Sequence, residues 1–419
     1  MRIFLWRGAA ESPQERPLDR NMARFALVLG ALSAAGPMAI DMYLPALPTI
    51  ARDLHATQGQ AELSMTTFFL GLMLGQPFYG PLSDRFGRKP PLAGGMMLFV
   101  LASVACSLAA APTVLIAGRF LQGLGSGSAI AISAATIRDR YTGHQAARLL
   151  ALRMMVLGLS PILAPVLGAG LISVVSWRFI FWFAAAYGLL ASALLALIPE
   201  TRDPEHRTAT HVAKVLGVWG RLVKDRTYIG AVSVVAFMQL AFSAYIADSS
   251  FVFIKIDHTP PWLYSAIYAS NAIGLISLAQ FAPNLMKRFA AERLIVAGSA
   301  LQAVNAVILF ACAATGHVSV AVLIVPLFLF LASFGLVGGP ATVTALHRHG
   351  PVAGTASSLL SLMQWGSAAL GSGLVAFFAN GTARPMTTVM MGAAVLGLLV
   401  AQAAFARRPA PTPVSAPAD

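Results

Sequence analysis

Charged residues are scarce in this sequence, and the acidic ones are the scarcer kind. Only 16 of the 419 residues are Asp or Glu, and charged residues of both signs make up 11% of the chain. A soluble globular domain carries about 25% charged residues, so the shortage excludes an ordinary water-soluble fold. Hydrophobic residues make up 57% of the chain and the mean hydropathy is +0.73, values that indicate a protein crossing a membrane many times.

Cysteine and the common catalytic motifs are nearly or wholly missing. The two cysteines, Cys106 and Cys312, lie in the middle of apolar stretches, where we interpret them as packing residues. The eight histidines lack the neighbouring ligands of a metal site, so we expect no metal and no cofactor. The sequence contains no GxSxG, HExxH or P-loop motif, which argues against an enzyme and against a nucleotide-driven pump.

Long apolar runs are what the sequence has in abundance. Each is about 20 residues long, enough to cross roughly 30 Å of hydrocarbon as a helix. The runs are continuous, whereas a membrane β-barrel needs short alternating strands. We therefore predict an all-α integral membrane fold with twelve transmembrane helices. The expected spans are residues 24–44, 62–82, 91–111, 113–136, 149–173, 178–198, 228–250, 262–283, 292–314, 317–341, 352–379 and 385–406.

The distribution of Lys and Arg predicts the orientation of these spans. Most of the 29 basic residues fall in alternate loops, on one side of the predicted membrane. The other side has only Arg52, Arg178, Lys255 and Arg384, and Arg119 lies inside a span. Because cytoplasmic loops retain positive charge, both termini are expected in the cytoplasm. The net charge of +13 is then a consequence of topology, and we expect no binding to nucleic acid.

The spans divide into two sets of six. We predict two pseudo-symmetric six-helix bundles, residues 24–199 and 228–406, joined by a polar cytoplasmic linker loop, residues 200–227. A cytoplasmic segment, residues 1–23, precedes them and a cytoplasmic tail, residues 407–419, follows. A weak repeat supports the division, because Leu82, Arg85 and Phe86 recur as Leu285, Arg288 and Phe289 between the second and third spans of each half.

The most informative motif is a charged turn between the second and third spans. It reads Gly80-Pro81-Leu82-Ser83-Asp84-Arg85-Phe86-Gly87-Arg88-Lys89. Its four charged residues are too polar for lipid, and Gly80 and Gly87 permit a tight reversal of the chain. The turn is therefore expected at a membrane surface, and it predicts a transporter.

Three charged residues inside the spans are candidates for function. Asp41 ends the first span, and a carboxylate there costs a few kcal/mol unless it meets water or a partner. Arg119 would cost about 2.5 to 3.5 kcal/mol unpaired, so it should face the central cavity and have an acceptor. Each has a structural alternative: a helix cap before Pro45 for Asp41, and hydrogen bonds to carbonyl groups for Arg119.

Asp248 is either a second protonation or cation-binding group, or a solvated carboxylate at the membrane interface. Further candidates for the cavity wall are Tyr43, Gln364 and Trp365.

Several of these stretches together resemble a known family. The charged turn is similar to the signature of the major facilitator superfamily, and the whole chain resembles its Bcr/CflA subfamily of drug:proton antiporters, the bicyclomycin- and chloramphenicol-type efflux transporters. The resemblance also rests on Asp41-Met42-Tyr43-Leu44-Pro45-Ala46-Leu47-Pro48, on Arg119-Phe120-Leu121-Gln122-Gly123, on Gly158, Pro161, Pro165 and Gly168 of the fifth span, and on Trp177-Arg178.

The resemblance implies a proton-driven exporter of hydrophobic or cationic drug-like molecules, working as a monomer in a bacterial inner membrane. It implies proton coupling by Asp41 and Arg119, and a cytoplasmic gate in which Asp84 meets the start of the eleventh helix, near residues 352–355. Two glycines expected in the fifth span are Ala164 and Ala169 here, which weakens the case for export over import. The alternative is a proton-coupled or facilitative carrier for a small metabolite, acting in uptake or export.

Overall fold

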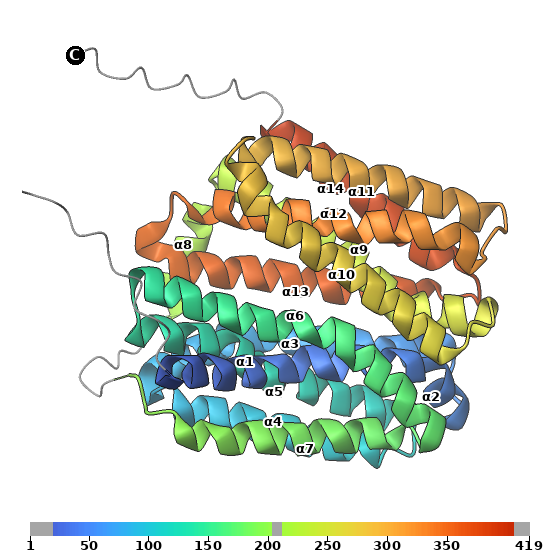
Figure 1. The fold of residues 1–419 in the computed structure, drawn as a ribbon, viewed down its shortest axis with the longest axis horizontal. Coiled ribbons are helices and arrows are strands. Elements are labelled where there is room, and N and C mark those ends of the chain that lie inside the picture. The colour runs from blue at the N-terminus through green and yellow to red at the C-terminus, as the bar shows by residue number, and fades with distance from the viewer. Residues whose placement is uncertain (1–19, 203–211, 406–419) are drawn as a thin grey trace, which may run out of the picture.

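The computed structural model describes residues 20–202 and 212–405, and within these ranges all regular structure is helical. Long helices run back and forth between the two ends of the molecule (Figure 1). The N-terminal half contains α1 (Arg20–Asp41), α3 (Gln58–Phe86), α4 (Lys89–Ser107), α5 (Pro112–Arg140), α6 (Gly143–Val174) and α7 (Arg178–Leu194). The C-terminal half contains α9 (Arg226–Ser250), α10 (Pro261–Met286), α11 (Ala291–Ala314), α12 (Val320–Leu346), α13 (Ala353–Phe378) and α14 (Arg384–Phe405).

These helices confirm the all-α membrane fold with twelve long helices. Eleven helical stretches in the described residues are long and apolar enough to cross a membrane. The twelfth is α3, which is 29 residues long but carries polar residues such as Gln58, Glu62 and Gln76. Those residues are not placed against lipid, since α3 packs between α5 and α13. A span that faces protein on two sides tolerates polar residues that a lipid-facing span does not.

The ends of the helices differ from the predicted ones in two informative places. The first span stops at Asp41, three residues earlier than expected, and the chain continues into the short helices η1 (Leu44–Ala46) and α2 (Leu47–Asp53). Pro45 explains the early stop, because its nitrogen carries no hydrogen to donate to the Asp41 carbonyl and its ring crowds that carbonyl. The predicted linker, 200–227, contains a helix, α8 (Val212–Leu222), where a loop was expected. The predicted segment 1–23 and tail 407–419 lie almost wholly outside the described residues.

The two halves lie against each other, the N-terminal half in blue to green and the C-terminal half in yellow to red (Figure 1). The main contacts between them are α3 with α13 and α6 with α10. The end that carries α8 and the turn between α3 and α4 is called the basic end here. The end that carries α2 and the turn between α9 and α10 is called the opposite end.

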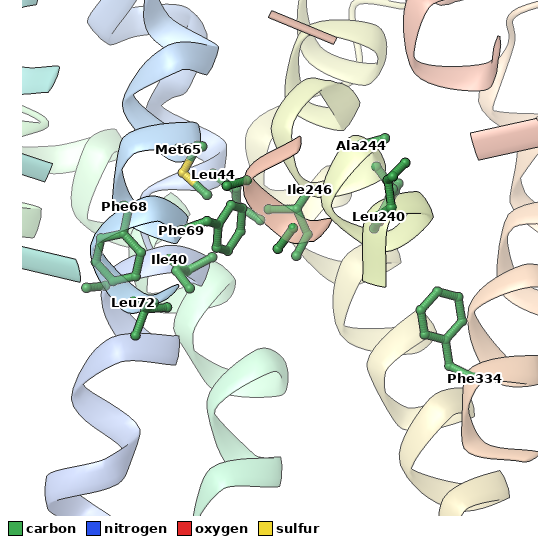
Figure 2. Close-up of a cluster of buried hydrophobic side chains, with 14 of the residues drawn as sticks. Ile40, Leu44, Met65, Phe68, Phe69, Leu72, Leu240, Ala244, Ile246 and Phe334 are labelled. Atoms are coloured by element: carbon green, nitrogen blue, oxygen red, sulfur yellow. The ribbon is translucent and has the colours of Figure 1, made fainter. Parts of the chain in front are cut away.

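Each half has a tightly packed apolar core that includes small residues where helices cross. A Cβ atom on Gly123 of α5 would collide with the carbonyl oxygen of Phe68 of α3, so only glycine allows this approach. Figure 2 shows the same region, where Phe69 and Leu44 of the N-terminal half lie beside Ile246 of α9 and Phe68 lies deeper in the N-terminal half. The apolar core therefore continues from one half to the other near the opposite end.

Candidate functional site

A cavity of about 440 Å³ lies between the two halves at the basic end. The N-terminal half contributes α3, α5 and α6 to its wall, and the C-terminal half contributes the first turns of α13. Polar and charged side chains are frequent in the wall: Gln76, Ser83, Asp84, Arg88, Arg138, Asp139, Arg153, Thr355, Ser357, Ser358 and Ser361. The chamber is large enough for a small organic molecule, which fits a binding site between two bundles.

The opposite end is closed by direct contacts between the halves. Four hydrogen bonds join the halves within the described residues: Tyr268 Oη to Asp41 Oδ1 (3.0 Å), Gln58 Nε2 to Asp248 Oδ1 (2.8 Å), Thr66 Oγ1 with Ser372 Oγ (2.9 Å) and Ser265 Oγ to the Pro165 carbonyl (3.0 Å). The rings of Phe69 and Trp365 also stack across the interface, with centroids 6.1 Å apart. The space between the halves is thus closed at one end and hollow at the other.

The charged turn at the basic end is organised around Arg88. Its Nη1 donates to Asp84 Oδ1 at 2.8 Å and to Ser83 Oγ at 2.6 Å. Its Nε and Nη2 donate to the two carboxylate oxygens of Asp139, at 2.6 and 3.1 Å. Asp84 is therefore paired within its own half. The start of α13, which the resemblance names as the partner of Asp84, lies in the wall of the same cavity at Gly354 and Thr355.

The remaining residues of the turn have separate roles in the structure. Gly87 ends α3 with φ +91°, a conformation that strongly favours glycine. Gly80 lines the cavity, and the space beside its Cα is open. Arg85 is exposed and lies over the ring of Phe86, 5.1 Å from its centroid.

Glu200, which the sequence did not single out, holds the start of α4. Its two carboxylate oxygens accept hydrogen bonds from the backbone N–H groups of Arg88 and Lys89, both at 2.9 Å. Burial raises the pKa of Glu200, but four backbone N–H donors outweigh it and leave the pKa below the ordinary 4.5. A carboxylate at the positive end of a helix is favourable, so Glu200 stabilises the folded turn.

Arg119 does not lie where the sequence led us to expect it. It is fully buried and is not part of the cavity wall. Its Nη1 donates to the Ala39 carbonyl at 3.1 Å and to Gln122 Oε1 at 2.6 Å. Its guanidinium also lies over the rings of Tyr43 and Phe68, 4.6 and 4.3 Å from their centroids. The expected cavity-facing position is therefore corrected: aromatic faces and a carbonyl group hold this cation in the core of the N-terminal half.

Asp41 has a partner in the other half and makes no ion pair with Arg119. Its carboxylate is 5% exposed and accepts the hydrogen bond from Tyr268. Tyr43, expected in the cavity wall, is instead fully buried, and its hydroxyl lies 2.8 Å from Ser64 Oγ. In this structure Asp41 thus belongs to the closed end, and a direct pairing with Arg119 is not formed.

The glycine and proline motif of the fifth span packs α6 against α10 of the other half and against the chain that follows α1. A Cβ on Gly168 would collide with the Met42 carbonyl, and the Pro165 carbonyl accepts a hydrogen bond from Ser265. Pro161 borders a small cavity of about 50 Å³ beside Tyr245 and Tyr268. Gly158 lies earlier in the same helix, where an added Cβ atom would lie 3.7 Å from Cδ1 of Ile276 of α10. The motif thus shapes a surface between the halves.

Asp248 is fully buried, so the expectation of a solvated carboxylate is wrong. Gln58 Nε2 donates to Asp248 Oδ1 and to Glu62 Oε1, each at 2.8 Å. Glu62 is also fully buried, and sequence reasoning missed it, because it stood at the edge of a predicted span.

The two candidates for the cavity wall on α13 lie away from the large cavity. Gln364 Nε2 donates to Gln239 Oε1 at 3.3 Å, and Trp365 stacks on Phe69.

Arg153 is a third residue that the sequence did not reveal. It is 6% exposed and lies in the wall of the cavity. Its Nε donates to Ser33 Oγ at 3.0 Å and its Nη2 to the Ile130 carbonyl at 3.2 Å. No described acidic residue forms an ion pair with it, so the cavity contains a positive charge that the wall does not neutralise.

For metals, the described residues include no group of three His, Cys, Asp or Glu side chains placed to hold an ion.

Comparison with known proteins agrees with this architecture. Residues 28–372 match the family model described as Major Facilitator Superfamily. The chain is 31% identical over 386 residues to "Uncharacterized MFS-type transporter YdgK" of Bacillus subtilis, covering 91% of this chain and 96% of that protein. It is 28% identical over 378 residues to "Bicyclomycin resistance protein homolog" of Haemophilus influenzae, with 90% and 94% covered. It is 29% identical over 380 residues to "Multidrug resistance protein MdtL" of Escherichia coli, with 90% and 95% covered.

Solved structures agree on the fold. A bacterial homologue of the human lysosomal transporter Spinster superposes with a TM-score of 0.71 at 15% identity, covering 93% of this chain and 97% of that chain. The xylose transporter XylE of Escherichia coli superposes with a TM-score of 0.73 at 13% identity, covering 91% and 97%.

Proposed function

Because the chain belongs to the Major Facilitator Superfamily, a family of membrane transporters, we propose that it exports hydrophobic or cationic drug-like molecules in exchange for protons. The single observation that carries the proposal is the one-sided cavity between the halves, hollow at the basic end and sealed at the opposite end. A carrier that works by alternating access needs a site that reaches one side of the membrane at a time. The multidrug and bicyclomycin resistance relatives support drugs as the substrate class.

In this proposal the basic end faces the cytoplasm. Arg85, Arg88 and Lys89 lie there, and cytoplasmic loops are the ones that retain positive charge. Relatives from bacteria favour the inner membrane as the location. One chain supplies both bundles and the whole cavity wall, so a monomer is a sufficient working unit.

Asp41 is the proposed carrier of the exchanged proton. It is a buried carboxylate with one partner, Tyr268, on the opposite half, so rocking of the halves breaks the contact and changes its surroundings. Buried carboxylates with such partners are typical of proton relays in transporters. Arg119 lies behind Asp41 in the same half, and its bond to the Ala39 carbonyl links it to the last turn of α1.

Asp84 is the proposed latch at the cytoplasmic side. When the basic end closes, the first turn of α13 approaches the turn between α3 and α4, and the carboxylate of Asp84 meets the positive end of that helix. The attraction is worth about 0.3 to 2 kcal/mol. In the open cavity Asp84 is held by Arg88 instead.

A second candidate, a carrier for a small metabolite, is favoured by Arg153. Its unneutralised charge in the cavity wall suits a solute with a carboxylate or phosphate group. An Arg153→Gln variant separates the two candidates, because it weakens binding of an anionic metabolite and leaves or improves binding of a cationic drug.

The test of the main proposal is transport in proteoliposomes with and without an imposed pH gradient, using a panel of fluorescent cations and antibiotics. We expect gradient-driven movement opposite to the proton flux, lost in Asp41→Asn. The matched control is Asp257→Asn, a carboxylate of the same type at the same end that accepts hydrogen bonds from Thr259 and Val320 of its own half. Movement in the direction of the proton flux would contradict export, and equal transport by Asp41→Asn would remove Asp41 from the mechanism.

A further inference from the structure

Two buried carboxyl groups, Glu62 on α3 and Asp248 on α9, face each other across the boundary between the halves. Both side chains are fully buried. They share one donor, since Gln58 Nε2 lies 2.8 Å from Glu62 Oε1 and 2.8 Å from Asp248 Oδ1. The two carboxyl groups are also within hydrogen-bonding reach of each other. A carboxyl pair this close does not hold two negative charges in a buried site, because like charges repel and neither is solvated.

The second oxygen of each carboxyl group points to a missing hydrogen. Glu62 Oε2 and Asp248 Oδ2 are buried and have no hydrogen-bond donor among the described residues. A carboxylate oxygen only accepts, so two carboxylates cannot satisfy each other unless one of them is protonated. One shared proton gives one group an O–H donor for the other, and the buried oxygens then have a partner.

None of the positive charges in the described ranges is placed to replace that proton. The elements packed against α3 and α9 carry the following ionisable groups near this end: Asp41, Tyr43, Arg52, Asp53, Arg119, Tyr245, Lys255, Tyr264, Tyr268 and Arg384, with His55, Asp257 and His258 in the turns. Arg52, Lys255, Arg384 and both histidines are exposed, and Arg384 donates to the Ala314 carbonyl. Arg119 is held by Ala39 and Gln122, Asp53 accepts from Trp177, and neither α12 nor α13 contains an ionisable side chain.

The geometry points to a proton-binding site, built from Glu62 and Asp248, that keeps the opposite end closed while the proton is bound. Each half supplies one carboxyl group, so the site exists only when the halves meet. Loss of the proton leaves two carboxylates in contact, and their repulsion separates the halves there. Because the site lies at the sealed end and not in the wall of the cavity, its proton exchanges with the side of the membrane that this end faces.

This inference deepens the proposed function and adds to it a control distinct from Asp41. A proton that enters and leaves on the same side does no transport work, so the pair adjusts the balance between open and closed states without adding to the number of protons exchanged. Acid on that side favours closure, and alkali favours opening.

The test measures a distance across the opposite end in lipid nanodiscs, where both sides have one pH and no transport is needed. Spin labels at Val174→Cys and Phe377→Cys, which are 83% and 82% exposed and lie in different halves, report closure. The native cysteines are replaced by Cys106→Ser and Cys312→Ser. All variants carry Asp41→Asn, so that the remaining pH dependence excludes that carboxylate and does not depend on the proposed antiport.

In this background we expect the ratio of closed to open states to fall as pH rises, by up to about tenfold per pH unit, the limit for one linked proton. Adding Glu62→Gln or Asp248→Asn should remove the dependence and keep the end closed, since an amide N–H replaces the shared proton. Adding Asp53→Asn, the matched control, should leave the dependence unchanged.

The inference is overturned if the background shows no pH dependence, or if Glu62→Gln and Asp248→Asn both keep it. A change caused by replacing sodium with choline at constant pH would also overturn it, in favour of a metal cation. If one variant fails to fold, infrared spectra decide: the C=O band of a protonated carboxyl group should be present in the background and absent from the variant that folds.

Discussion

The hydroxyl group of Tyr268 donates a 3.0 Å hydrogen bond to Oδ1 of Asp41, so a residue of α10 in one half holds the last residue of α1 in the other. Both groups are buried, with Asp41 5% and Tyr268 4% exposed. The contact therefore belongs to a sealed interface that must break whenever the opposite end opens.

Tyr268→Phe should shift the molecule away from the closed state. The substitution keeps the ring and removes the one hydrogen bond to Asp41, which is worth about 1 kcal/mol or more, so the closed state should lose about fivefold or more in population. The measurement is the distance between spin labels at Val174→Cys and Phe377→Cys. Tyr187→Phe is the control, because Tyr187 donates to Ala31 within one half and should leave the distance unchanged. An unchanged distance in both variants would mean that the Tyr268 contact does not contribute to closure.

Arg119→Ala should damage both stability and transport, and more severely than Arg119→Lys. Removing the guanidinium leaves a void between Tyr43 and Phe68 and strips Gln122 of a partner, a loss of about 3 kcal/mol. Lysine retains the charge and part of the volume. Melting temperature in detergent and transport rate are measured together. Equal activity of the two variants would show that transport does not need a cation at this position.

Asp84→Asn should slow the alternation between states with little loss of substrate affinity. Its bond to Arg88 is partly exposed and worth at most about 1 kcal/mol, so the open state changes little. The closed basic end loses the attraction to α13. Transport rate and equilibrium binding of the same compound separate the two effects, and a defect confined to affinity would argue against the latch. Arg85→Gln is the control in the same turn, because Arg85 is exposed and its guanidinium lies over the ring of its neighbour Phe86.

Gly168→Ala and Gly170→Ala form a matched pair two residues apart on α6. The added methyl group meets the Met42 carbonyl at position 168 and open space at position 170. Gly168→Ala should therefore lower the melting temperature and weaken closure. Gly170→Ala should be neutral or add up to about 1 kcal/mol of helix stability. Identical effects would contradict the close approach of α6 to the chain after α1.

The depressed pKa of Glu200 predicts a loss of stability in acid. A carboxylate whose pKa is lower in the folded state contributes stability above its ordinary pKa of 4.5, and loses it as pH falls through the folded value. The wild type should therefore lose melting temperature faster than Glu200→Gln below about pH 4.5. At pH 7 the variant should be the less stable of the two. Parallel curves would show that the bonds to Arg88 and Lys89 do not depend on the charge.

The fold was predictable because the membrane imposes a length and a polarity on each span. The sequence indicated twelve helices, and the weakest of them, α3, is the one that faces protein instead of lipid. Helix α8 was not predictable from the same signal. It has 11 residues, too few to span, and one of its contacts is the hydrogen bond from Trp219 Nε1 to the Thr355 carbonyl.

The sequence predicted several site residues, but it did not predict which residues of the other half they contact. The sequence selected Asp41, Asp84 and Asp248 because charge inside or beside a span is costly. It could not supply Tyr268 or Glu62, since those partners come from the packing of segments about 190 to 230 residues apart. Arg119 was misplaced for a related reason, because we expected it to face the central cavity, whereas cation–π contacts and a carbonyl group, the structural alternative, hold its charge in the core of one half.

The polar contacts that close the opposite end are individually weak. Within the described residues no ion pair joins the halves, and the four hydrogen bonds between them contribute about 0.5 to 1.5 kcal/mol each. The resistance of this end to opening therefore comes mainly from the apolar packing between the halves, which includes the stack of Phe69 on Trp365. A ligand opens such a seal only by as much as it binds the open state more tightly than the closed one.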